Sequence, residues 1–212
     1  MLTITLLGTA ATMPLPDRAL TAALAECGGH ALLFDCGEGT QAAARRAGVN
    51  LMKLDAICLT HYHGDHTGQM LRIRPEIPIY AGALAKDIMR LSAERGGQKN
   101  EALCRRIETI QTFSPGKPFL IGDIQITPFC IDHSACDSYL FLIEADGKRL
   151  LYTGDFRLHG VRGNVMDKIL DRRVGTVDVV VTEGTTVSRS EHEVVTEWDL
   201  SLIHISEPTR LD

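Results

Sequence analysis

Residues 59–68 have the sequence LTHYHGDHTG, and this stretch decides how the whole chain is interpreted. An apolar run ends at Thr60, and His61, His63, Asp65 and His66 follow within six positions. Imidazole nitrogens and carboxylate oxygens without a thiolate are typical ligands of catalytic zinc, manganese or iron(II). In a loop that follows a strand, alternate side chains can face one point, and the side chains that come after them can face a second point nearby. The spacing therefore predicts a centre for two metal ions; the alternative is a pH-sensitive histidine cluster on the surface.

Three more segments place a polar side chain directly after an apolar run. They are FDCGEGTQ at 34–41, IDHSACDSY at 131–139 and LLYTGDFRLHG at 150–160, and the side chains are Asp35, His133 and Asp155. Each side chain has an ordinary alternative role, because a strand-end aspartate often forms a turn and a histidine can cap or fill a core. The order of the segments favours a shared site instead.

The H-x-H-x-D-H pattern, together with these ordered segments, resembles the signature of the metallo-β-lactamase superfamily. The resemblance implies that the site residues have separate tasks. Asp65 and His66 would bind a second metal ion, Asp155 would bridge both ions, and Asp35 would orient a ligand histidine without touching metal. The first ion would be held by His61, His63, His133 and Asp155. The second ion would have Asp65, His66 and Asp155, which leaves it one ligand short.

Alternating strand-like and helical segments predict a mixed α/β fold. The resemblance implies the four-layer αββα metallo-β-lactamase fold, incomplete at the C-terminus, with residues 1–199 forming the N-terminal portion of that domain. The expected strands are Thr3–Leu7, Ala31–Asp35, Ala56–Thr60, Ile77–Tyr80, Ile124–Phe129, Tyr139–Glu144, Leu150–Thr153 and Val177–Thr182. The expected helices are Gly39–Ala47, Gly82–Arg95, Glu101–Ile107 and Val165–Asp171.

The end of the chain has a different character. Residues 200–210, LSLIHISEPTR, resemble a translated sequencing adapter, so we expect residues 200–212 to be a non-native tail; a short genuine strand is the alternative. The superfamily supplies its missing ligand from a downstream histidine, and His159, His192 and His204 do not match it. The sequence therefore predicts a truncated chain that binds its second metal ion weakly and has little or no activity.

Two branches of the superfamily share features with the chain. LLGTAATMP at 6–14 and THYHGDHTG at 60–68 resemble ribonuclease Z, which trims transfer-RNA precursors. DHSACDSYLFLIEADGK at 132–148 and VVTEGTTVSR at 180–189 resemble the ribonuclease J or β-CASP nucleases, in which Glu183 would match an acidic motif. Glu183 is equally compatible with an ordinary strand-end charge. Superfamily membership is therefore better supported than either branch.

Composition limits the partners and the compartment. The formal net charge of −5 argues against broad, nonspecific binding of nucleic acid. Arginine pairs such as Arg45–Arg46 and Arg72–Arg74 could line a local groove; the alternative is that they are solvated helix faces. The chain has no long apolar run and no basic leader, which predicts a cytoplasmic protein without a membrane partner. Its six scattered cysteines indicate buried free thiols. The oligomeric state is left open.

The resemblance implies a metal-dependent hydrolase, specifically a phosphodiesterase or ribonuclease that acts on RNA. Two divalent ions, Zn²⁺ or alternatively Mn²⁺, would generate a hydroxide that attacks the phosphorus, while Asp65 orients it and accepts its proton. One alternative is a hydrolase of the same fold that acts on a thioester, lactone or β-lactam. A second alternative is an inactive metal-binding fragment.

Overall fold

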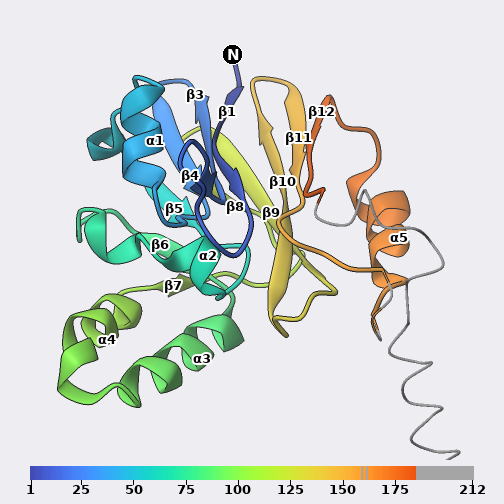
Figure 1. The fold of residues 1–212 in the computed structure, drawn as a ribbon. Coiled ribbons are helices and arrows are strands. Elements are labelled where there is room, and N and C mark those ends of the chain that lie inside the picture. Colours follow the sequence, from blue (N-terminus) through green and yellow to red (C-terminus); the bar gives the residue numbers. More distant parts are fainter. Residues whose placement is uncertain (159, 161, 185–212) are drawn as a thin grey trace, which may run out of the picture.

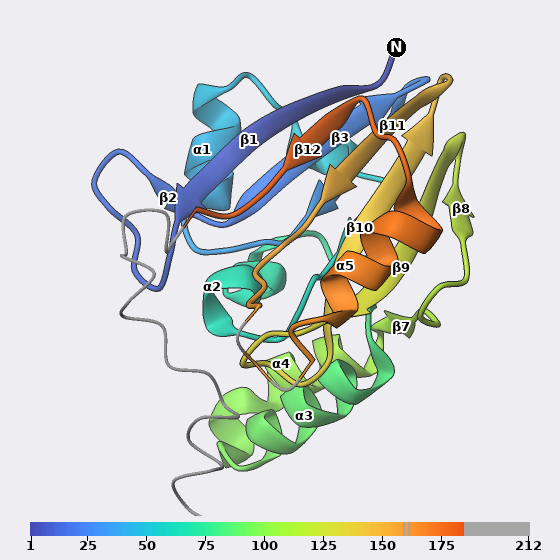
Figure 2. The ribbon, with the colours of Figure 1, turned by 90° about the vertical axis from the view of Figure 1, so that its right-hand side faces the viewer.

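Two β-sheets pack face to face at the centre of the computed structural model, and helices cover their outer faces (Figures 1 and 2). The structure describes residues 1–158, 160 and 162–184. From edge to edge, the first sheet contains β2 (Ala19–Leu20), β1 (Thr3–Ala10), β3 (Ala22–Cys27), β4 (His30–Phe34), β5 (Ala56–Cys58), β6 (Ile79–Ala81) and β7 (Gln111–Thr112). The second contains β12 (Val179–Val181), β11 (Lys148–Tyr152), β10 (Ser138–Ala145), β9 (Ile124–Ile131) and β8 (Phe119–Ile121).

Helices form the two outer layers. The outer face of the first sheet packs against α1 (Thr40–Arg46), α3 (Ala83–Glu94) and α4 (Glu101–Glu108). The outer face of the second sheet packs against α5 (Val165–Ile169), which continues as the π-helical turn η4 (Leu170–Val174). Four short turns complete the described part: α2 (Gly64–Thr67), η1 (Leu51–Lys53), η2 (Met70–Arg72) and η3 (Gly97–Asn100).

Alternating side chains in the central strands explain why both sheet faces are buried. In β10, Phe141 and Ile143 point into the core between the sheets, whereas Leu140 and Leu142 point toward α5. In β4, Leu33 points toward the helices of the first sheet. Strands that are buried on both faces have nearly continuous apolar sequences. This double burial makes the strands recognisable as apolar runs and produces the four layers.

Strand direction brings the polar segments to one edge of the sandwich. Strands β4 and β5 are parallel, so Asp35 and His61, which follow them, lie at the same sheet edge. Strands β9 and β11 are both antiparallel to β10, and β12 is parallel to β11. His133 and Asp155 therefore follow strands that run the same way. The backbone N–H of Tyr139 donates to the carbonyl of Thr60 at 2.9 Å and joins the two sheets at this edge.

The expected α/β class and αββα layers are confirmed. Strand β3 and the short strands β2, β7 and β8 were not predicted from the sequence. Strand β3 is rich in alanine, which has low strand propensity, but it lies between β1 and β4, where burial and pairing override propensity. No helix in the described part of the chain is both long and apolar enough to cross a membrane. The predicted tail at residues 200–212 and the downstream histidines His159, His192 and His204 lie outside the described residues.

Candidate metal centre

Five predicted ligand side chains gather at the common edge of the two sheets. His61, His63 and His133 each offer a nitrogen, and these three atoms lie within 4.8 Å of one another. His61, His66 and Asp155 form a second group under the same distance limit. The two groups share His61, whereas the sequence analysis assigned His61 to the first ion only. Asp155 Oδ2 lies 3.4 Å from His66 Nε2 and 3.9 Å from His133 Nε2, so this carboxylate faces both groups.

The Nε2 atom of His61 tests whether these residues fit a metal ion. It is buried and has no hydrogen-bond partner within the described residues, whereas His66 Nε2 faces Asp155 Oδ2 at 3.4 Å. A buried polar atom without a partner costs free energy, so such atoms are rare unless they have a function. Neutral imidazole nitrogens that converge beside a carboxylate are suited to a divalent cation. The residues present therefore fit a divalent metal ion.

Asp35 is buried beside the centre and holds its residues in place through hydrogen bonds. Its side chain is 0% exposed and its backbone φ is +59°, which is unusual for a residue other than glycine. Its Oδ1 accepts hydrogen bonds from the backbone N–H and the hydroxyl of Thr60 at 2.8 and 2.9 Å. Its Oδ2 lies 3.0 Å from His66 Nδ1 and accepts from the Tyr152 hydroxyl at 3.1 Å. The carboxylate thereby holds His66 with Nε2 directed at Asp155.

Thr60 sets the tautomer of His61 through the same carboxylate. Because the Thr60 hydroxyl donates to Asp35, its oxygen is left to accept from His61 Nδ1, which is 3.0 Å away. A proton on Nδ1 leaves a lone pair on Nε2. Gly154 allows this packing, because its φ is +56° and an added Cβ would lie 2.7 Å from Thr60 Cγ2. Residues that contact no ion thus prepare His61 as a ligand.

Burial and charge shift the pKa values of the histidines in opposite directions. Burial lowers the pKa of His61 far below its ordinary value, and the neighbouring histidines lower it further. Burial also lowers the pKa of His133, although Asp155 opposes that shift. Burial works against a charged His66 too, but the carboxylates of Asp35 and Asp155 outweigh it and raise the pKa of His66 to about 10. Metal-free protein therefore has a neutral His61 beside a protonated His66 near neutral pH.

We expect binding of the ion that His66 holds to displace about one proton per chain near neutral pH, because His66 must lose its Nε2 proton before it can bind metal. Isothermal titration calorimetry in buffers of different ionisation enthalpy measures this release. The His66→Gln variant serves as the control and is expected to bind without releasing that proton. If the unaltered chain binds Zn²⁺ without releasing a proton, His66 keeps its proton and is not a metal ligand.

The same shift predicts how the stability of the metal-free chain depends on pH. The folded-state pKa of His66, about 10, lies above the ordinary value of 6.5. The interaction of charged His66 with Asp35 and Asp155 therefore adds fully to the free energy of unfolding below about pH 6.5. This contribution is lost as the pH rises through about 10.

Asp65 lies beside the centre without belonging to either group of three. Its Oδ2 is 4.0 Å from His66 Nε2 and accepts a hydrogen bond from the backbone N–H of Thr12 at 3.2 Å. Thr12 has a φ of +61°, a left-handed conformation that costs about 1 kcal/mol or more for a residue other than glycine. The strained loop between β1 and β2 thus supplies a fixed donor to the Asp65 carboxylate, a role that the sequence analysis missed.

The Thr12→Pro variant is expected to lower the affinity of the centre for Zn²⁺ by about tenfold or more, because proline removes the N–H donor to Asp65 and cannot adopt φ +61°. Thr12→Gly keeps the donor and relieves the strain, so its Zn²⁺ affinity should stay close to that of the unaltered chain. Competition with a chromophoric chelator measures the Zn²⁺ affinity of the two variants. Equal losses in both variants would assign the effect to the threonine side chain.

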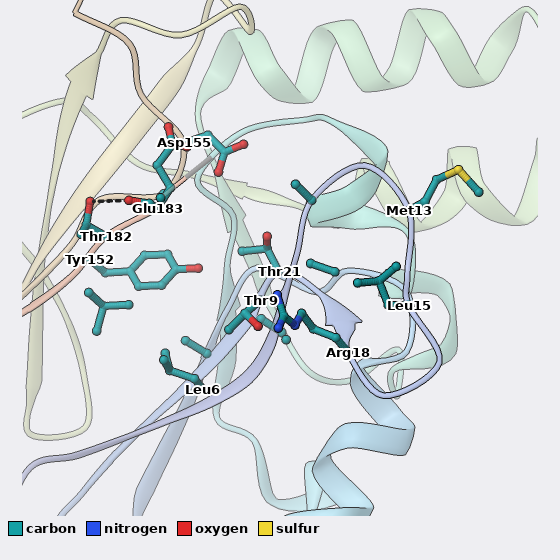
Figure 3. Close-up of a pocket in the computed structure, with 18 residues that line it drawn as sticks. Leu6, Thr9, Met13, Leu15, Arg18, Thr21, Tyr152, Asp155, Thr182 and Glu183 are labelled. Carbon is teal, nitrogen blue, oxygen red and sulfur yellow. Dashed lines mark hydrogen bonds between the residues drawn. The ribbon is translucent and has the colours of Figure 1, made fainter. Parts of the chain in front are cut away.

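A cavity of about 510 Å³ opens beside Asp155, between the β1–β2 loop and the ends of β11 and β12 (Figure 3). Asp155, Glu183 and Tyr152 border one part of it, and Arg18 lies in another part (Figure 3). Glu183 Oε1 accepts a hydrogen bond from the backbone N–H of Phe156 at 3.0 Å. The predicted acidic-motif residue is therefore next to the centre, where it fixes the chain that follows Asp155.

A family model described as "Beta-lactamase superfamily domain" matches residues 30–207. The chain belongs to the beta-lactamase superfamily. The match includes every candidate ligand named above. The resemblance seen in the motif order is thereby confirmed at the level of the superfamily.

Known proteins resemble this beta-lactamase superfamily chain in sequence and in fold. A curated protein named Ribonuclease Z from Lachnoclostridium phytofermentans is 33% identical over 159 residues, which are 70% of this chain and 51% of the relative. The chain thus spans about half the length of that relative. The metallo-beta-lactamase fold protein YhfI from Bacillus subtilis has a TM-score of 0.64 at 20% identity, over 85% of this chain and 71% of that one. Human tRNase Z, short form, has a TM-score of 0.55 at 24% identity, over 73% and 69% of the two chains.

Proposed function

We propose that this chain is a metal-dependent hydrolase that cleaves phosphodiester bonds in RNA. The observation that carries the proposal is the pair of adjoining ligand groups that share His61 and face Asp155. Paired cations suit a phosphodiester, because they can neutralise charge on the attacking oxygen and on the phosphoryl oxygens in the transition state. The relative named Ribonuclease Z, at 33% identity, supports RNA as the substrate.

The proposed ligands follow the sequence prediction. His61, His63 and His133 would hold one ion, while Asp65 and His66 would hold a second, with Asp155 between them. We expect Zn²⁺, with Mn²⁺ as the alternative, because nitrogen and oxygen ligands without thiolate accept both ions. Bound ions of this kind supply Lewis acidity and lower the pKa of a water molecule toward neutrality.

The chain's own residues orient the ligand rings and accept a proton. Asp35 holds the His66 ring, and Thr60 holds the His61 ring in the tautomer that leaves Nε2 free. Asp65 Oδ2 accepts from Thr12 N, which leaves Oδ1 to accept the proton of the attacking water. The cavity beside Asp155 provides space for the substrate chain. Residues 1–199 would form the domain that carries these steps.

A substrate panel tests the proposal. The purified chain, loaded with Zn²⁺ or Mn²⁺, is assayed with bis(p-nitrophenyl) phosphate, a short RNA, a thioester, a lactone and a β-lactam. Because the second ion is one ligand short in this chain, we expect slow hydrolysis of the phosphodiesters that needs excess metal, is lost on chelation and returns with metal. His63→Ala should abolish it, whereas His30→Ala is a matched control, because His30 pairs with Asp55 away from the centre. Turnover of the acyl substrates alone, or metal binding with no hydrolysis, would overturn the proposal.

A further inference from the structure

A second concave surface lies between α1, η1 and the end of η2. It has a volume of about 460 Å³, within the range of roughly 300–1,000 Å³ typical of ligand pockets. Arg45, Arg72 and Arg74 line it together with apolar and uncharged residues, and no acidic residue is part of its lining. We call this surface the arginine groove. None of its residues belongs to the metal centre.

The charges of the arginine groove are largely uncompensated. Arg45 and Arg72 are exposed, and neither forms an ion pair within residues 1–158, 160 and 162–184. Only Arg74 has an acidic partner, Glu76, at 3.2 Å, in an exposed pair that is worth little. Arg105, in contrast, is paired with a glutamate one helical turn away on α4. Positive charge in a concave surface attracts anions more strongly than the same charge on a convex one.

The walls of the arginine groove are held in place by side-chain hydrogen bonds. Gln41 Nε2 donates to the carbonyl of Arg72 at 2.6 Å and joins α1 to η2. Arg74 donates to the carbonyl of Met52 at 3.4 Å and joins the segment after η2 to η1. Arg106 donates to the carbonyls on either side of Glu76, at Pro75 and Ile77. The backbone that carries the arginines is therefore preorganised, which lowers the entropic cost of binding.

The arginine groove is close enough to the metal centre for one ligand to reach both. Arg72 follows His66 by six positions, so their backbones are at most about 22 Å apart. The loop that bears Asp35 fixes this segment, because Cys36 N–H donates to the carbonyl of His66 and the carbonyl of Cys36 accepts from Gln69 N–H. Helix α1 lies above α2 in both ribbon views (Figures 1 and 2).

We propose that the arginine groove binds the phosphate backbone of the RNA whose scissile bond lies at the metal centre. This inference rests on the proposed function and adds a second contact, remote from the bond that is cut. Guanidinium groups bind phosphate with paired N–H donors, and contacts of this type carry no base specificity. The groove would fix the register of the substrate on the enzyme.

Two charge-matched double variants test the arginine groove in the full chain. Arg45→Glu with Arg72→Glu reverses two charges in the groove, and Arg90→Glu with Arg105→Glu makes the same change of net charge on α3 and α4. Fluorescence anisotropy measures the affinity for a labelled RNA across a salt series. We expect the groove variant to bind about tenfold more weakly or worse, with a salt slope lower by about 1.5 for two lost phosphate contacts. The control should stay within about twofold of the unaltered chain.

Hydrolysis of bis(p-nitrophenyl) phosphate separates this inference from the proposed function, because the small diester cannot reach from the metal centre to the groove. The groove variant should hydrolyse the diester at the rate of the unaltered chain, and this rate also shows that the variant is folded. If the charge reversal unfolds the chain, Arg45→Ala with Arg72→Ala is the milder variant. Two results would contradict RNA binding by the arginine groove and leave the proposed hydrolase unaffected. One is equal RNA affinity in the two double variants, and the other is no RNA binding by a chain that hydrolyses the diester. A chain that binds RNA through the groove but hydrolyses no diester contradicts the proposed function only.

Discussion

Replacing Asp35 with asparagine is expected to lower the affinity of the metal centre for Zn²⁺ by about 10- to 100-fold, although Asp35 need not touch an ion. Asp35 Oδ2 faces His66 Nδ1 at 3.0 Å and therefore keeps a proton on that nitrogen. If the asparagine amide nitrogen takes this position, it donates to Nδ1 and moves the ring proton to Nε2. A protonated Nε2 has no lone pair for metal, so His66 is lost as a ligand without being mutated.

Competition with a chromophoric chelator measures the Zn²⁺ affinity of the Asp35→Asn variant. Tyr152→Phe is the matched control, because it removes one hydrogen bond from the same oxygen and leaves the carboxylate charge and the His66 contact in place. We expect the control to bind Zn²⁺ within about threefold of the unaltered chain. Unchanged affinity in Asp35→Asn would remove the orienting role of Asp35.

Asp155→Ala is expected to loosen both metal ions and to reduce diester hydrolysis by at least about a thousandfold, which corresponds to roughly 4 kcal/mol. Asp155 Oδ2 lies within 4 Å of a histidine from each ligand group, at His66 and His133. Both histidines contribute to holding the pKa of Asp155 below its ordinary value against burial, so the carboxylate is ionised at neutral pH. Removing it takes away the carboxylate of the second group, which also lies beside His133 of the first.

Metal content and turnover are measured together on the Asp155→Ala variant. Asp87→Ala removes an exposed carboxylate from the middle of α3 and serves as the control, with both quantities expected to stay unchanged. Loss of a single ion with the other firmly held would limit Asp155 to one site. Normal turnover without Asp155 would exclude a bridging role.

Local sequence predicted the residues at the centre because each follows an apolar strand. Asp35 follows β4, His133 follows β9 and Asp155 follows β11; strands that run the same way within a sheet end at one edge, and the packing of the two sheets brings those edges together. The runs were recognisable because those strands are buried on both faces. The ligand roles stay predictions, whereas the proximity of the side chains is a property of the fold.

The residues that sequence analysis missed act through long-range contacts. Tyr152 and Asp35 are 117 positions apart, and Thr12 and Asp65 are 53 apart, so no local periodicity can pair them. Weak signals were present. Tyr152 is a hydroxyl-bearing residue in an otherwise apolar strand end, and Thr60 places a hydroxyl immediately before His61. A buried hydroxyl must find a partner, which the fold supplies as Asp35 in both cases.

Anomalous scattering at the zinc edge from crystals of the chain grown with Zn²⁺ tests the central claim most directly. We expect density for an ion about 2.0–2.1 Å from the imidazole nitrogens of His61, His63 and His133. A second ion is expected between His66 and Asp155, close enough for Asp155 to contact both. Zinc bound only elsewhere on the chain, with His61 and His66 left unligated, would contradict the account.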